Sequence, residues 1–199
     1  MIEYISLGSN CSISYQLNKY NLRKNAYPFD WCKININQLI NILENNFENF
    51  IETIEYQKES INHLFIDSNN NDITNRGSIV LKNYYSIKFA HELLKKEDIN
   101  EFKNKLLRRI KKFINIKNLS SKIIFLWIEM KPINDNWENK ILKLLELLNL
   151  FSKDYILKLI INSTKQFVNL PEYVQIYRYN EFNSDWKMNS LNWKVIFEL

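Results

Sequence analysis

The chain has 199 residues but only two glycines, three prolines, two cysteines and two histidines. Cys11 and Cys32 are too few for a disulfide framework, and they do not form a zinc-binding spacing. Two glycines also exclude the repeated glycines of a G-x-G-x-x-G nucleotide-binding loop. No apolar run approaches the roughly 18 residues of a membrane-spanning helix. We therefore expect no membrane span, no metal and no cofactor.

The start of the chain has no basic region followed by an apolar core, so a signal peptide is not expected. Together with the scarcity of cysteine, this predicts a soluble intracellular protein, cytoplasmic and with reduced thiols. Asparagine, isoleucine and lysine are used heavily. This bias is typical of an AT-rich genome, such as that of a large DNA virus or an AT-rich microbe. For a viral protein, the host cell or the virion would be the location.

Composition favours one packed domain over residues 1–199, with 46% hydrophobic and 14% aromatic residues and no linker. The net charge of +5 comes from basic residues spread along the chain. They are densest in a predicted helix whose apolar stripe is Phe102, Leu106, Ile110 and Phe113. The basic residues occupy the other faces of this helix, which indicates a solvated surface. No nucleic-acid partner is expected.

Strand and helix patterns alternate along the chain. Periodicity and capping residues predict these elements: strands at 2–7, 122–128, 155–161 and 174–179, helices at 11–20, 98–115 and 136–151, a helix capped by Asn37, a hairpin pairing 64–66 with 79–81, and an edge strand at 195–197. The continuous apolar run at 122–128 is typical of a strand that is buried on both faces. This order predicts an α/β fold, with a mainly parallel central sheet flanked by helices.

The most informative motif is Gly8-Ser9-Asn10-Cys11-Ser12, which joins the first strand to the first helix. A thiol at a helix N-terminus is close to unpaired N–H groups, which favour the thiolate. This position predicts a partly accessible, low-pKa nucleophile at Cys11. The alternative is a half-buried cysteine that packs as a small hydrophobic residue.

Several motifs resemble one family over nearly the whole chain. They are Ser6-Leu7-Gly8-Ser9-Asn10-Cys11, Tyr15-Gln16-Leu17, Leu22-Arg23-Lys24, Tyr27-Pro28-Phe29-Asp30-Trp31, Tyr85-Ser86-Ile87-Lys88-Phe89-Ala90-His91, the Arg108-Arg109 pair and the tail from Trp186 to Trp193. Together they resemble the papain-like cysteine peptidase family DUF1796, a domain family of unknown function whose activity is itself inferred. The resemblance implies a thiol-dependent hydrolase or acyltransferase that uses a Cys–His pair, Cys11 and His91. Its substrate would be a peptide, an isopeptide or another acyl compound.

The resemblance and the periodicity imply different folds. A papain-like α+β fold pairs a helical lobe with an antiparallel, barrel-like sheet, whereas the alternation over 121–179 favours a parallel sheet. We give the periodicity precedence and keep the papain-like fold as the alternative. Either fold leaves Cys11 at a plausible pocket, because ligands of open parallel sheets bind at the carboxyl ends of the strands.

Cysteine catalysis needs a base near the thiol and a group that orients the base. His91 is the preferred base and His63 the fallback, although a packing role for His91 is equally compatible with the sequence. Asp30 is the preferred orienting residue, and a purely structural role for its carboxylate stays open. We expect the 27–31 loop to hold this carboxylate in a fixed set of hydrogen bonds. The other candidates for the orienting role follow the strand at 122–128 and are Glu129, Asn134 and Asp135.

The same segment supports a second interpretation, a non-catalytic domain that binds a sugar or phosphate ligand. In this interpretation Gly8, Ser9, Asn10 and Ser12 form an anion cradle at the first helix N-terminus. Arg23, Arg76, Arg108 or Arg109 could add positive charge. A third possibility is an interaction module that presents the tryptophan-rich tail, although tryptophans are more often part of a core.

Overall fold

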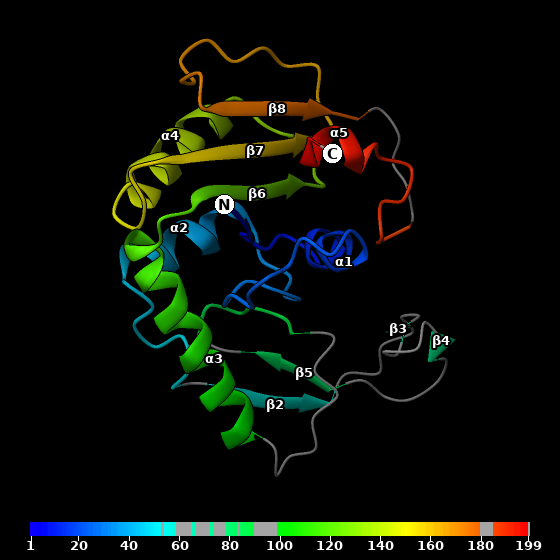
Figure 1. The fold of residues 1–199 in the computed structure, drawn as a ribbon. Coiled ribbons are helices and arrows are strands. Elements are labelled where there is room, and N and C mark those ends of the chain that lie inside the picture. Colours follow the sequence, from blue (N-terminus) through cyan, green and yellow to red (C-terminus); the bar gives the residue numbers. More distant parts are fainter. Residues whose placement is uncertain are drawn as a thin grey trace.

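The computed structural model describes residues 1–52, 54–58, 65–66, 72–73, 79–82, 84–89, 99–179 and 185–198. Its centre is a sheet with the strand order β1-β6-β7-β8, in which every neighbouring pair is parallel (Figure 1). The strands are β1 (Ile2–Ser6), β6 (Lys122–Glu129), β7 (Tyr155–Ile161) and β8 (Val174–Arg178). The predicted α/β class is confirmed, and the papain-like alternative is wrong for this sheet.

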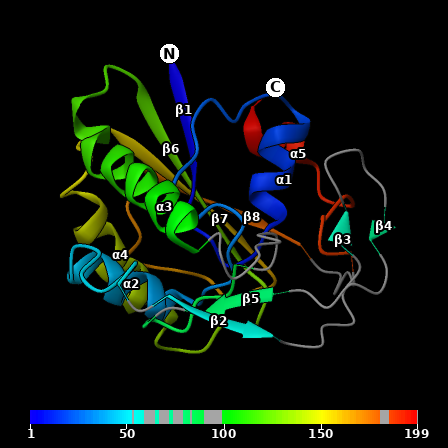
Figure 2. The ribbon, with the colours of Figure 1, turned by 90° about the horizontal axis from the view of Figure 1, so that it is seen from below.

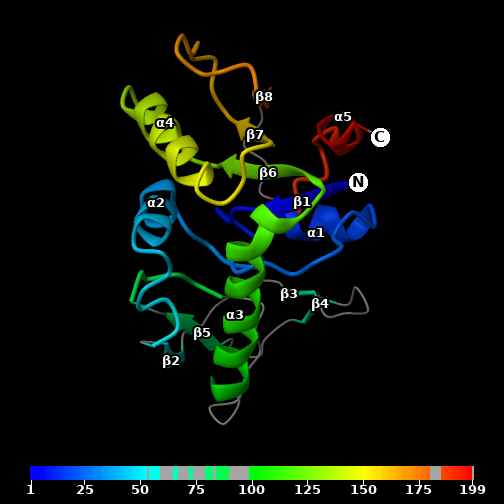
Figure 3. The ribbon, with the colours of Figure 1, turned by 60° about the vertical axis from the view of Figure 1, so that its left-hand side comes forward.

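Helices cover both faces of the sheet. One face carries α2 (Ile36–Glu44), α3 (Ile99–Ile114) and α4 (Trp137–Leu148), and the other carries α1 (Ser12–Lys19) and α5 (Trp193–Phe197). Figures 2 and 3 show α1 and α5 together on their side of the sheet, away from α2 and α4. Residues 123–128 of β6 are all buried, because alternate side chains of this strand enter the two layers.

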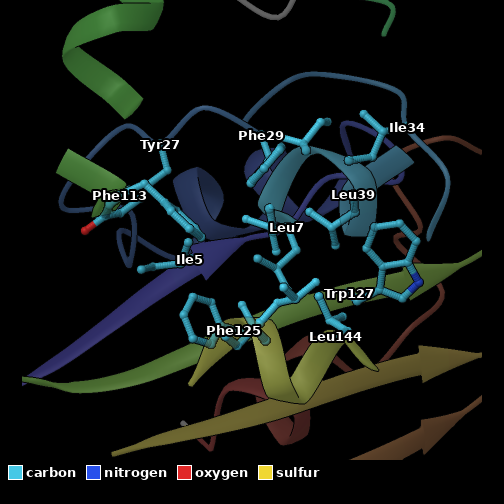
Figure 4. Close-up of a cluster of buried hydrophobic side chains, with 14 of the residues drawn as sticks. Ile5, Leu7, Tyr27, Phe29, Ile34, Leu39, Phe113, Phe125, Trp127 and Leu144 are labelled. Atoms are coloured by element: carbon cyan, nitrogen blue, oxygen red, sulfur yellow. The ribbon is translucent and has the colours of Figure 1, made fainter. Parts of the chain in front are cut away.

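The larger core lies under α2, α3 and α4 and is rich in aromatic residues (Figure 4). Ile5 and Leu7 meet Phe125 and Trp127 of the next strand there. The ring of Phe29 packs against Phe113 of α3 at 5.6 Å between centroids. The predicted stripe of α3 is confirmed, since Phe102, Leu106, Ile110 and Phe113 are its buried residues.

The smaller core on the α1 and α5 face contains a buried charge. Lys158 of β7 is fully buried, and its Nζ donates to Ile196 O at 2.7 Å and to Glu198 Oε1 at 2.8 Å. This lysine holds the C-terminal end of α5 on the sheet. The predicted edge strand at 195–197 is therefore wrong: these residues end a helix, whose N-cap is the side chain of Asn192.

Two short antiparallel pairs lie apart from the main sheet (Figure 1). The strand β2 (Glu55–Lys58) pairs with β5 (Ile79–Lys82), and β3 (Phe65–Ile66) pairs with β4 (Asp72–Ile73). The predicted hairpin therefore has the wrong partners. Apolar alternation identifies strands, but it does not specify which strand pairs with which.

The cap of α2 also differs from the prediction. Asn35, two residues before the expected Asn37, accepts a hydrogen bond from Gln38 N, and the Gln38 side chain accepts one from Asn35 N. In the part of the chain that the structure describes, no helix is long and apolar enough to cross a membrane.

Candidate functional site

The loop after β1 turns sharply at the carboxyl end of the sheet. Gly8 and Ser9 both have positive φ angles, 93° and 75°. A Cβ built on Gly8 would lie 3.2 Å from the Ile34 side chain and 3.4 Å from Cys32 Sγ. Glycine is therefore required at position 8 for both its backbone conformation and the close approach of the 32–34 segment.

Cys11 is the N-cap residue of α1 and is partly exposed. Its carbonyl accepts the first helical hydrogen bond from Tyr15 N at 3.0 Å. The side chain that caps the helix belongs to Asn10, whose Oδ1 accepts bonds from Ser12 N, at 2.9 Å, and from Ser12 Oγ. The thiol thus sits at the predicted helix start, beside a cap that the preceding residue provides.

The pKa of the Cys11 thiol moves in the opposite direction to the one predicted. Burial raises this pKa to about 12, and the positive charge of Lys33 opposes the rise only in part. The prediction of a low-pKa thiol is therefore wrong for the resting protein, because desolvation outweighs the helix N-terminus. At neutral pH the thiol is protonated, so nucleophilic attack would need a base.

Cys32, which directly follows the aromatic 27–31 loop, is fully buried. Its Sγ lies 3.1 Å from Phe29 O, to which the thiol donates. Burial raises the pKa of Cys32 well above its ordinary value, the Cys11 thiol and Asp30 add to the rise, and Arg109 opposes it. The two thiols are therefore electrostatic neighbours, but only Cys11 has access to solvent.

Asp30 is buried within a set of hydrogen bonds and an ion pair. Its Oδ2 accepts from Arg23 Nη2 at 2.7 Å, Arg23 Nε at 3.0 Å and Tyr27 N at 3.0 Å. Its Oδ1 accepts from Ser14 Oγ at 3.1 Å. Ser14 Oγ in turn accepts from Trp31 N at 3.4 Å. The predicted fixed environment of Asp30 is confirmed, and it links the 27–31 loop to α1.

Sequence reasoning missed the roles of Arg23 and Ser14 in this cluster. The sequence suggests Arg23 only as an extra cation for an anion cradle, yet its guanidinium forms the ion pair with Asp30. The spacing of Arg23 and Asp30, seven residues apart across a loop, carries no periodic signal. Ser14 is fully buried on α1, and a single serine among helical residues gives no sign in the sequence of the carboxylate to which it donates.

The segment that leads toward His91 lies beside the thiol loop. Lys33 and Lys88 form an isolated antiparallel bridge, with Lys33 N donating to Lys88 O at 2.8 Å and Lys88 N to Lys33 O at 3.4 Å. The Sγ of Cys32, the neighbour of Lys33, would lie 3.4 Å from a Cβ built on Gly8. His91, His63 and Arg76 lie outside the described residues.

The alternative orienting residues after β6 have different surroundings. Asp135 is fully exposed and pairs with Lys165 at 2.9 Å, which lowers the pKa of the Asp135 carboxyl. Asn134 is also exposed, and its carbonyl accepts a bond from Lys165. Glu129 is partly buried at the end of β6, where its carboxylate accepts Lys131 N at 3.2 Å.

Aromatic rings and a lysine lie one helical turn after Cys11. Tyr15 packs edge-on against Trp186 at 5.4 Å between ring centroids, and Lys187 Nζ lies 5.6 Å from the Tyr15 ring. Trp186 and Trp31 are partly exposed, whereas Trp127, Trp137 and Trp193 belong to the core. Within the described ranges, no group of three or more metal-ligating His, Cys, Asp or Glu side chains occurs.

Comparison with known proteins agrees with the motifs at the site. A sequence profile of the family described as "Putative papain-like cysteine peptidase (DUF1796)" matches residues 2–161. The chain is also 32% identical over 215 residues to the uncharacterized protein R408 of Acanthamoeba polyphaga mimivirus, covering 97% of this chain and 96% of that relative. No solved structure matches. The profile match spans most of the chain, and it shows that this protein belongs to the DUF1796 family.

Proposed function

We propose that the protein is a thiol-dependent hydrolase or acyltransferase in which Cys11 is the nucleophile and His91 the general base. The Cys11 sulfur attacks the carbonyl carbon of a peptide, isopeptide or other acyl group while the base takes the thiol proton. The tetrahedral intermediate then expels the leaving group, which receives that proton, and leaves an acyl-thioester. Water or a second nucleophile releases the acyl group.

The Lys33–Lys88 bridge is the observation that carries this proposal. It joins the 84–89 segment to the 32–34 segment, which packs against Gly8, three residues before Cys11. His91 follows Lys88 by three residues, and three residues span at most about 10 Å. The chain can therefore deliver this imidazole to the neighbourhood of the thiol despite the long separation in sequence.

The raised pKa of Cys11 defines what the base must do. With a thiol pKa of about 12, little thiolate is present at neutral pH. We therefore propose that Cys11 gives its proton to the base during the attack, and that the two groups do not form a thiolate–imidazolium pair beforehand. Proton transfer of this kind contributes about 100-fold or more to rates.

The backbone at the helix start supplies the candidate oxyanion donor. Ser12 N is already bonded to Asn10 Oδ1, so we assign the N–H of Cys11 as the oxyanion donor. The same bond weakens the anion-cradle alternative, because Asn10 and Ser12 satisfy each other. Ser9 and Ser12 are also buried.

We assign Asp30 a positioning role. Both of its oxygens are occupied by Arg23, Tyr27 and Ser14, and the Ser14 bond fixes the loop against the helix that Cys11 begins. The residue that orients His91 is left among Glu129, Asn134 and Asp135.

The test is the rate of Cys11 alkylation by iodoacetamide in a Cys32→Ser background. We expect His91→Ala to slow alkylation at neutral pH by about 100-fold. His63→Ala is the matched control, since it removes the other histidine, and it should react like the background protein. Equal rates for His91→Ala and the background would overturn the assignment of the base.

A further inference from the structure

One stretch of the chain carries positive charge without balancing carboxylates. Residues 102–128 form most of α3, the 3-10 turn Asn115–Asn118 and most of β6, and they contain no aspartate or glutamate. Their cations exceed the net charge of the whole chain, +5, so the rest of the chain is net negative. This asymmetry creates a local positive potential. The cations are Lys103, Lys105, Arg108, Arg109, Lys111, Lys112, Lys117 and Lys122.

Four of these cations are exposed, and none of the ion pairs in the described ranges involves them: Arg108, Lys111, Lys117 and Lys122. Arg108 and Lys111 lie three residues apart on α3, away from its buried stripe. Lys117 follows on the 3-10 turn, and Lys122 begins β6. In Figures 1 and 2 the last turn of α3 and the start of β6 lie side by side, close to the start of β1.

The segment after α1 adds a fifth cation. Lys24 is exposed, and its Nζ donates to Ile2 O at 2.9 Å. Ile2 lies opposite Lys122 in the register of β1 and β6. The next residue, Asn25, accepts a bond from Lys112 Nζ of α3 at 3.1 Å. These contacts join α3, β1 and β6 into one basic surface, made of Lys24, Arg108, Lys111, Lys117 and Lys122.

The carboxylates near the starts of β1 and β6 do not neutralise the basic surface. Glu3 is buried and accepts from Tyr27 OH at 2.9 Å. Glu198 pairs with the buried Lys158 at 2.8 Å. Asp154, just before β7, is exposed and makes no ion pair in the described part of the chain. Five exposed cations against these carboxylates leave this surface positive.

Exposed aliphatic side chains lie between the cations of the basic surface. Leu107, Leu119 and Ile2 are 36%, 44% and 39% exposed. Leu119 lies between Lys117 and Lys122 in the chain, and all four aromatic rings of residues 102–128 are buried. A mostly apolar groove adjoins the surface and is lined by Ile2, Tyr4, Leu22, Lys24, Phe197 and Glu198.

This combination fits a lipid bilayer better than a nucleic acid. Proteins that lie on a membrane pair lysine and arginine with apolar side chains that enter the headgroup region. Nucleic-acid surfaces instead add exposed aromatic rings on which bases stack, and exposed leucines have no such role. Anionic headgroups also complement the charge of the surface.

We propose that the basic surface binds anionic lipid headgroups, with Leu119 in the interfacial layer of the bilayer. Ile2 begins β1 at this surface, and the loop that carries Cys11 follows the other end of the same strand. The thiol would therefore lie at the end of the sheet away from the lipid. The inference does not depend on the proposed function, and its variants should leave alkylation of Cys11 unchanged.

The experiment measures cosedimentation of the full chain with lipid vesicles. Vesicles of phosphatidylcholine alone are compared with vesicles of phosphatidylcholine and phosphatidylserine in equal parts. We expect the protein to bind the mixed vesicles at low salt, to bind them less at high salt, and to leave the phosphatidylcholine vesicles free. Equal binding to both kinds of vesicle, or binding to neither, would overturn the inference.

Lys122→Gln should lower the partition coefficient about fivefold, the effect of one cation near an anionic bilayer surface. Lys131→Gln is the matched control, because Lys131 is exposed just beyond the other end of β6 and removes the same charge. This control should bind like the unmodified protein. An equal decrease in the two variants would overturn the inference, since net charge alone would then explain the binding.

Leu119→Asn tests the apolar part of the surface at constant charge and should lower the partition coefficient about tenfold. Val168→Asn, at a valine that is 85% exposed outside this surface, is its control and should bind unchanged. Unchanged binding of Leu119→Asn would overturn the inference. The surface would then be a general polyanion site, which binding of a DNA duplex with the same dependence on Lys122 would identify.

Discussion

The segments that carry Cys11 and Cys32 lie near each other, but the two sulfur atoms differ in their access to solvent. Burial raises the pKa of both thiols, and each lies near the same glycine loop. Cys32 sits in a loop closed by aromatic rings and donates to Phe29 O, whereas Cys11 begins a helix and is partly exposed. The difference teaches that access to solvent separates the candidate nucleophile from the structural thiol here.

The largest effect on stability is expected at Asp30, whose hydrogen bonds join the 27–31 loop to α1. Asp30→Asn removes the charge that pairs with Arg23 and should lower the free energy of unfolding by about 3 kcal/mol or more. Urea denaturation measures this. Asp135→Asn is the matched control, because its exposed ion pair should be worth less than about 1 kcal/mol. Equal losses of unfolding free energy in the two variants would contradict the role of Asp30 in holding the 27–31 loop on α1.

Gly8, where the loop before Cys11 approaches the 32–34 segment, should show the next largest effect on stability. Gly8→Ala places a Cβ at 3.2 Å from Ile34 and keeps a φ of 93°, so it should cost about 1–2 kcal/mol. Ser9→Gly, at the neighbouring positive φ of 75°, should be neutral or slightly stabilising. Thermal melts of the two variants would test this, and a wild-type melting temperature for Gly8→Ala would contradict the packing.

The alkaline pH dependence of stability should distinguish the thiols from the rest of the protein. Both folded pKa values are raised, so each thiol contributes stability that is present below the unfolded pKa, about 8.5, and is lost as pH rises above it. For Cys11 the loss extends to about pH 12. Cys32→Ala and Cys11→Ala should each fall less steeply than wild type over this range, measured by urea denaturation at several pH values. Buried tyrosines contribute equally to all three proteins, so a slope that does not change would contradict the raised thiol values.

The smallest effect on Cys11 reactivity is expected at the buried lysine of the smaller core. Lys158→Met removes the two bonds to Ile196 O and Glu198 and should cost about 1–3 kcal/mol, from the buried carbonyl left without a donor. Iodoacetamide alkylation of Cys11 should not change, because these two bonds hold α5 and not the loop that carries Cys11. A parallel loss of Cys11 reactivity would show that the two regions are coupled.

Much of the fold could be predicted because it rests on local periodicity. The apolar run of β6 and the stripe of α3 specify buried faces, and both were found where expected. The partners of β5 and the helical form of residues 195–197 could not be predicted, because they depend on distant residues such as Lys158. Pairing and tail conformation are tertiary properties, and short apolar runs fit strand and helix alike.

The candidate site divides in the same way. The position of Cys11 at a helix start and the held carboxylate of Asp30 followed from sequence, since glycine, caps and an aromatic loop act locally. The direction of the Cys11 pKa shift did not follow from sequence, because it is set by burial in the folded protein. The bridge between Lys33 and Lys88 could not be predicted either, because two residues 55 positions apart carry no spacing signal.

The most direct test of the central claim is a pH titration of the Cys11 thiolate by its ultraviolet absorbance in the Cys32→Ser protein, run beside the alkylation rates. The account predicts that the thiolate forms only well above the ordinary cysteine value of about 8.5, while alkylation at neutral pH still depends on His91. A thiolate already formed at slightly acidic pH would contradict it and would restore activation by the helix N-terminus.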